Sequence, residues 1–342
     1  MKNLLIASTA IVATAGVAAA DVALSGRAEM GIFQQNDAFI NARAATPIAN
    51  PSDGAQFFTD IDVTFTMSGE TDNGLTFGAS VDLDEGGAGA AAVANNADDG
   101  GATIFISGGF GTVTMGDTDG ALDWALTEAG NVGNPGSIAD DETAHAGYLG
   151  SYLDGTSAGA NGDGQILRWD FTAGAFGVAI SLEDDNGSAA ANTGVGYAIG
   201  FKYALDLGGT TVNLGLGYQE AADNGGATNT GTPNDITAVG VSADATFANG
   251  LSAGIVYTDF DDSLVDNHIG IGLGYTTGAF SIHANYGKMD GVVAANDQEG
   301  YGLSAAYDLG GGAVVHFGYG AGDRGVNGPT ERSVSLGLGL SF

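Results

Sequence analysis

The chain has 342 residues, of which 41 are acidic and only 8 are basic, so its formal net charge at pH 7 is −33. This excess of carboxylates excludes nucleic acid as a partner, because binding to phosphates depends on lysine and arginine. Cysteine is absent, so neither a disulfide framework nor a thiolate metal site can form. Intrinsic disorder requires low hydrophobicity, whereas 44% of these residues are apolar.

The N-terminus has the pattern of a cleaved secretory leader. Lys2 precedes a run of small and apolar residues from 4 to 17, and three alanines at 18–20 match the small residues that signal peptidase requires. The run is shorter than the ~20 predominantly apolar residues of a membrane-spanning helix. We therefore expect a leader at 1–20 and a mature chain that begins at Asp21.

Alternation of apolar and polar residues dominates the rest of the chain and predicts strands, because period 2 places successive side chains in opposite environments. In the first such segment, Val22, Leu24 and Met30 oppose Arg27 and Glu29. Counting in chain order gives sixteen expected strands, at 22–30, 60–67, 75–84, 101–108, 111–117, 167–171, 176–183, 195–206, 212–218, 235–247, 251–260, 268–275, 280–286, 301–307, 315–319 and 333–342.

The connections between these segments alternate between short glycine turns and long loops rich in Asp, Asn and Gly, which is typical of an outer-membrane barrel. A soluble β-sandwich would not sort its connections by length in this way. An even number of strands can close without a free edge, and sixteen strands enclose an aqueous channel. We therefore predict that residues 21–342 form one all-β domain, a transmembrane antiparallel up-and-down barrel, and that small inward residues leave its lumen open.

The longest interval without a strand pattern, 117–164, is acidic and contains no lysine or arginine. Unstructured connections longer than ~12–15 residues are uncommon in compact domains unless they are functional or disordered. We expect this loop to fold into the lumen, where carboxylates would concentrate cations and repel anions. Asp123 and Glu128 are our first candidates to line the path; the full predicted set is Asp117, Asp119, Asp123, Glu128, Asp140, Asp141 and Glu142.

Several strand–turn motifs resemble those of general diffusion porins of Rhodobacter-type α-proteobacteria. They are FTMSGETDNGLTFGAS at 65–80, IFISGGFGTVTMGD at 104–117, TAGAFGVAISL at 172–182 and AYDLGGGA at 306–313, together with the mature start DVALSG and the terminal Phe342. The resemblance covers the mature chain in order. It implies a sixteen-stranded outer-membrane barrel, a homotrimer, passive diffusion of small hydrophilic solutes, and a long third loop that folds inward.

One departure concerns the barrel wall, where such porins set a basic cluster against the acidic loop. The second expected strand has Asp60 and Asp62 on its inward face instead. The residues that we expect to line the pore wall are Arg27, Glu29, Asp60, Asp62, Arg168, Asp170, Lys202, His283 and His316.

We expect no required cofactor and no enzymatic activity, because no nucleophile–base arrangement is present in the sequence. Ca²⁺ bound by loop carboxylates is a possible structural ion, although the spacing of an EF-hand loop is missing. The expected partners are two further copies of the chain, outer-membrane lipid and lipopolysaccharide, and small solutes. Two alternatives stay open: a barrel that acts as an adhesin or loop-borne binding protein, and a secreted soluble β-protein.

Overall fold

The computed structural model describes residues 21–43, 54–88, 101–150, 165–184, 195–221, 236–261, 263–325 and 328–342. The expected leader at 1–20 lies outside these residues. Among the described residues, no helix is long and apolar enough to cross a membrane.

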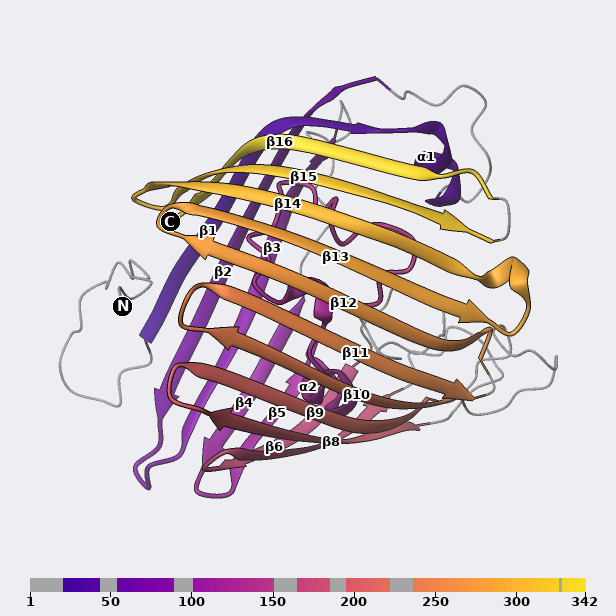
Figure 1. The fold of residues 1–342 in the computed structure, drawn as a ribbon. Coiled ribbons are helices and arrows are strands. Elements are labelled where there is room, and N and C mark those ends of the chain that lie inside the picture. The colour runs from indigo at the N-terminus through magenta and orange to yellow at the C-terminus, as the bar shows by residue number, and fades with distance from the viewer. Residues whose placement is uncertain are drawn as a thin grey trace.

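Sixteen strands form the fold, as the alternation predicted (Figure 1). The first eight are β1 (Asp21–Gln35), β2 (Gln56–Glu70), β3 (Thr76–Ala88), β4 (Ala102–Gly108), β5 (Gly111–Gly116), β6 (Gln165–Ala173), β7 (Phe176–Asp184) and β8 (Val195–Asp206). The others are β9 (Thr210–Ala221), β10 (Ile236–Phe247), β11 (Leu251–Asp261), β12 (Val265–Thr277), β13 (Phe280–Gly291), β14 (Gln298–Gly310), β15 (Ala313–Arg324) and β16 (Glu331–Ser341).

The sheet closes on itself through its first and last strands. Each strand pairs antiparallel with its neighbours in sequence, and β1 also pairs with β16, placing Arg27 opposite both Asp62 of β2 and Ser341 of β16. A closed sheet has no edge, so every backbone N–H and C=O of the ladder can be paired away from water. The predicted up-and-down barrel is confirmed.

The outside of the barrel is apolar, and the inside is polar or small. On β12, Ile271 and Leu273 point outward and are 42% and 54% exposed, whereas His268 points inward and is 2% exposed. This pattern reverses that of a soluble protein, because the large apolar side chains cover the outer surface. Such a surface is suited to the hydrocarbon of a membrane.

Short turns connect the strands at one end of the barrel. At Gly250 and Gly278 the backbone has positive φ (88° and 60°), a conformation that glycine adopts without steric cost. Most of the connections at the opposite end are longer, and the one between β1 and β2 contains helix α1 (Asp37–Arg43). A 3₁₀ turn, η3 (Ala294–Asn296), lies in another.

The connection after β5 lies inside the ring of strands, as its length predicted (Figure 1). It contains helix α2 (Ala121–Ala125) and the 3₁₀ turn η2 (Ala129–Asn131), neither of which the alternation of residues predicts. Helix α2 packs on β7, β8 and β9, and η2 packs on β11, β12 and β13. The fold therefore places an inward loop, here called the constriction loop (117–150 in the described residues), against the lumen wall.

Candidate functional site

The constriction loop is fixed to the wall at its start through helix α2. The backbone N–H of Ala121 donates to Ser181 Oγ of β7 at 2.8 Å. Two residues beyond the helix, Thr127 donates through its backbone to Ser242 Oγ at 2.9 Å and through its hydroxyl to Asp244 Oδ1 at 2.7 Å, both on β10. These bonds satisfy backbone groups that would otherwise be buried without partners.

Further along, the loop follows the wall as far as the barrel closure and then turns back. Ser304 of β14 donates to Asn134 at 2.6 Å, and His316 Nδ1 of β15 is 3.0 Å from the carbonyl oxygen of Gly136. Ile138 is buried beside glycines of β1 and β16. Asp140 follows with a φ of 47°, the only left-handed non-glycine residue described, and the chain reverses there.

Inward glycines allow the loop backbone to lie directly on the strands. At each position a Cβ atom would overlap a carbonyl oxygen of the loop, so no other residue fits without displacement. These docking glycines are Gly200, Gly215, Gly272, Gly287, Gly302 and Gly320, opposite the carbonyls of Ala121, Ala125, Ala129, Gly147, Glu142 and Asp141 respectively. The expectation that small inward residues leave the lumen open is therefore wrong for this part of the wall, because they form the loop's docking surface.

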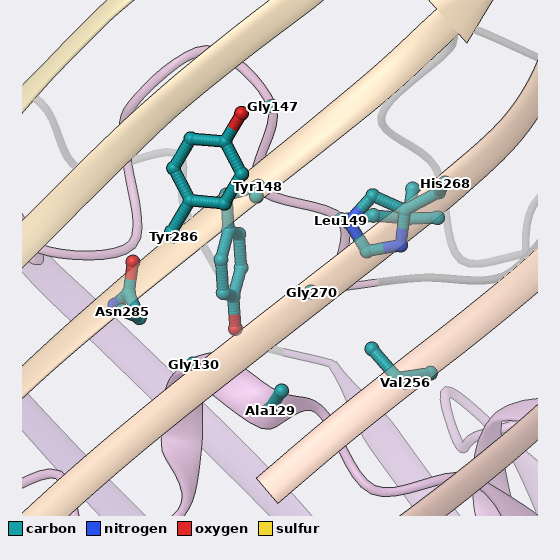
Figure 2. Close-up of a pocket in the computed structure, with 11 residues that line it drawn as sticks. Ala129, Gly130, Gly147, Tyr148, Leu149, Val256, His268, Gly270, Asn285 and Tyr286 are labelled. Carbon is teal, nitrogen blue, oxygen red and sulfur yellow. The ribbon is translucent and has the colours of Figure 1, made fainter.

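The seam between loop and wall is packed with little free space. Figure 2 shows one gap in it, where Tyr148 and Leu149 of the loop face Val256, His268 and Asn285 of the wall. This cavity measures about 10 Å³, which is room for about one water molecule. The loop is thus held as part of the barrel interior.

Carboxylates near the start of the loop share an open cleft with the wall. A cleft of about 490 Å³ is lined by Asp119, Asp123 and Glu128 of the loop and by Lys202 and Asp244 of the wall. The side chain of Asp119 is 65% exposed. These loop carboxylates therefore face an aqueous space.

Two inward cations of the wall, Arg168 and Lys202, contact the start of the loop. Arg168 Nη1 donates to the backbone oxygen of Asp119 at 2.6 Å, and its Nε lies 3.4 Å from Asp170. The Lys202 ammonium lies 4.2 Å from the centre of the Trp124 ring, within the range of a cation–π contact. Arg168 and Lys202 therefore hold the base of the loop.

Across the lumen, the inner face of β2 and β3 is acidic. Carboxylate oxygens of Asp60, Asp62 and Asp84 all lie within 4.8 Å of one another. Arg27 of β1 is nearby but pairs with Glu29. The wall thus keeps carboxylates where the resemblance led us to expect a basic cluster.

Asp140, at the reversal of the loop, connects this acidic wall to the loop. Burial raises its pKa, and the neighbouring carboxylates Glu142 and Asp60 raise it further, while Arg27 lowers it. Because Asp140 interacts electrostatically with both Arg27 of β1 and Asp60 of β2, the turn of the loop lies near these strands.

Most of the chain matches a known protein family. The model of the Gram-negative porin family matches residues 7–326. The chain belongs to the Gram-negative porin family. A porin of Rhodobacter capsulatus is 30% identical over 314 residues, which cover 86% of this chain and 92% of that protein.

Solved porin structures superpose along the whole barrel. A porin structure refined at 1.8 Å resolution has a TM-score of 0.68 at 27% identity and covers 94% of this chain and 100% of its own. A triple mutant of the Rhodopseudomonas blastica porin has a TM-score of 0.62 at 20% identity with the same coverage. The chain is therefore an outer-membrane general diffusion porin that crosses the membrane many times as β-strands, and the predicted family is confirmed.

Not all of the predicted loop carboxylates reach the water path in this porin. Asp141 and Glu142 are 0% and 1% exposed, because they lie between the loop and the wall. Burial raises the pKa of Asp141 to about 6. Asp117 is half-buried at the start of the loop. Asp119, Asp123, Glu128 and Asp140 remain as candidates to meet solutes.

Glu128 is held in place by two donors from its own loop, the amide of Asn131 and the hydroxyl of Tyr148. Burial raises the pKa of Glu128, and both hydrogen bonds act against that rise. The bonds keep its carboxylate at the cleft rather than free in solution.

The predicted wall histidines face inward, but the loop covers them. His283 and His316 are 3% and 6% exposed. They therefore belong to the seam and not to the water path.

Within the described residues, no three loop carboxylates converge closely enough to share an ion; the three that do converge are on the wall. Structural Ca²⁺ at the loop stays a prediction.

Sequence reasoning missed the polar wall residues that anchor the loop, namely Ser181, Ser242, Asn285 and Ser304. Period 2 places them on the inner face but does not distinguish an anchor from a residue in contact with water. One signal was available, the run of alternate glycines at 270, 272 and 274, which leaves a strip of wall without side chains. Such a strip indicates close approach of another backbone.

Proposed function

We propose that this porin prefers cations over anions, because carboxylates line both sides of its constriction. Asp119, Asp123 and Glu128 face the cleft from the loop, and Asp60 and Asp62 face the lumen from β2. A channel lined by one sign of charge raises the local concentration of the opposite ion. Arg168 and Lys202 also carry charge at the base of the loop, but these five carboxylates outnumber the two cations.

The solutes are then small and hydrophilic, and they cross passively without a chemical step. The loop narrows the lumen, so size sets an upper limit, and the carboxylates favour cationic over anionic solutes of equal size. This proposal rests on one observation above the others, the absence of a basic cluster opposite the loop among the described residues of β2 and β3.

The reversal potential of single channels in a salt gradient tests the preference. With KCl more concentrated on one side, we expect a potential of the sign that K⁺ permeation produces, and we expect it to shrink at high salt as screening shortens the Debye length from about 10 Å to about 3 Å. A potential near zero, or of anionic sign, would refute the proposal. A protein that inserts but does not conduct would favour the loop-borne binding alternative.

We propose further that three copies associate through the wall around β4 and β5. These strands have 7 and 6 residues, fewer than the ~9–11 that span the hydrocarbon in a tilted barrel strand. Yet Ile104 and Met115 on their outer face are 66% and 54% exposed in the single chain. A second barrel would cover a wall too short for lipid, while the longer strands face outer-membrane lipid and lipopolysaccharide.

Light scattering of the detergent-extracted protein measures this association directly. We expect a protein mass of three chains after subtraction of the detergent. A mass of one chain in a mild detergent, with conductance retained, would contradict it.

A further inference from the structure

His145 lies at the far end of the constriction loop and is 4% exposed. The Tyr148 ring meets it edge-on, with ring centroids 6.0 Å apart. On the wall side, a side chain at Gly300 of β14 would collide with its Nδ1 atom. The imidazole is thus enclosed between the loop and two strands, β13 and β14.

Both ring nitrogens of His145 face oxygen atoms. Nδ1 is 2.7 Å from the carbonyl oxygen of Ala146, and Nε2 is 2.7 Å from Oδ1 of Asn285 on β13. The carbonyl can only accept. The orientation of the Asn285 amide is fixed by its other end, where Nδ2 donates to the carbonyl oxygen of Glu142 at 2.9 Å. A flipped amide would set two oxygens against each other at that distance.

Two acceptors require two donors, and a neutral imidazole has only one N–H. We propose that His145 is doubly protonated while the loop is docked, and that loss of one proton at alkaline pH releases this end of the loop from β13. The bond from an imidazolium is charge-assisted and therefore stronger than one between neutral groups. A neutral ring would point a lone pair at one of the two oxygens.

The charged and titratable groups around His145 are compatible with one positive charge there. From the loop come the buried carboxylate of Glu142 and the Tyr148 hydroxyl, which is bonded to Glu128. From β12 comes His268, which interacts electrostatically with His145, and β13 adds His283, which interacts with Glu142. A second charge on His268 would be repelled, so one imidazolium is expected, and the net charge of −33 favours it.

The direction of the pH effect follows from where the proton is held. A docked loop that needs an imidazolium is stable below the pH at which an exposed histidine deprotonates, about 6.5, and weakens as pH rises through the higher value at which His145 loses its proton. This is opposite to a loop held by neutral histidines. The proposed pH effect concerns the motion of the loop and is independent of the proposed charge preference.

Single-channel recording between pH 6 and pH 9 tests whether loss of a proton from His145 releases the loop. For the wild type we expect steady conductance at pH 6 and, at pH 9, transitions between conductance levels that are about tenfold more frequent, as the loss of a charge-assisted bond implies. For His145→Gln we expect the same frequency of transitions at pH 6 and at pH 9. His316→Gln is the matched control, because Nδ1 of His316 faces a single acceptor, the carbonyl oxygen of Gly136, and a neutral tautomer can donate to it. This variant should keep the wild-type change between pH 6 and pH 9.

The proposal fails if the frequency of transitions in the wild type does not change between pH 6 and pH 9. It also fails if His145→Gln retains this pH-dependent change, or if His316→Gln abolishes it. ¹⁵N NMR of wild-type imidazoles provides a test that does not depend on a variant that folds. We expect both nitrogens of one histidine to carry protons at pH 7.5, a signal absent from His145→Gln. Four neutral imidazoles at that pH would overturn the proposal.

Discussion

Replacement of Gly272 by leucine is expected to displace the constriction loop from the wall and to raise single-channel conductance about twofold or more. The first added carbon would overlap the carbonyl oxygen of Ala129. The strand cannot yield, because β12 is paired on both sides, so the loop must move. Overpacking of this kind costs about 1–3 kcal/mol, or more where the obstacle is backbone.

Conductance and the rate at which liposomes swell in sugars of increasing size measure this effect. Gly109→Leu is the control, since nothing lies within 4 Å of a Cβ atom there and its backbone is not left-handed. We expect it to conduct like the wild type. Wild-type conductance in Gly272→Leu, with normal assembly, would show that the docking glycines do not hold the loop.

The double variant Asp60→Lys with Asp62→Lys is expected to abolish or reverse the proposed cation preference. It converts the acidic inner face of β2 to a basic one opposite the loop, which is the arrangement that the resemblance had implied. A charge at 4 Å contributes about 1 kcal/mol in water and about 4 kcal/mol near a protein surface. If the free energy of a cation relative to an anion in the pore changes by about 1.4 kcal/mol, the cation-to-anion permeability ratio changes tenfold.

The matched control changes the same number of charges outside the lumen. Asp259 and Asp261 of β11 are exposed on the outward row of Tyr257, at the end with the long connections. Substitution of both by lysine alters the net charge by the same amount but should change the reversal potential only slightly. Equal shifts in the two double variants would mean that overall charge, and not the β2 wall, sets the preference.

The local pattern predicted the barrel because it reports which face each residue occupies. Ile271 and Leu273 alternate with Gly270 and Gly272 within one strand, and this spacing alone separates lipid from lumen. The length of the connection after β5 indicated that it lies inside. The pattern could not reveal which acidic residues of the loop contact water and which are buried, since Asp123 and Asp141 look alike in the sequence.

The residue pattern was sufficient to predict the class of fold, the sixteen strands, the acidic character of the loop and the family. It did not predict that Asp141 and Glu142 are buried, that glycines form a docking surface, or that His145 contacts Asn285; these follow from the three-dimensional fold. The reason is the range of the interactions. Alternation is set between residues two apart, whereas the bonds from wall to loop join residues 49 to 180 positions apart, and these exist only once the barrel has closed.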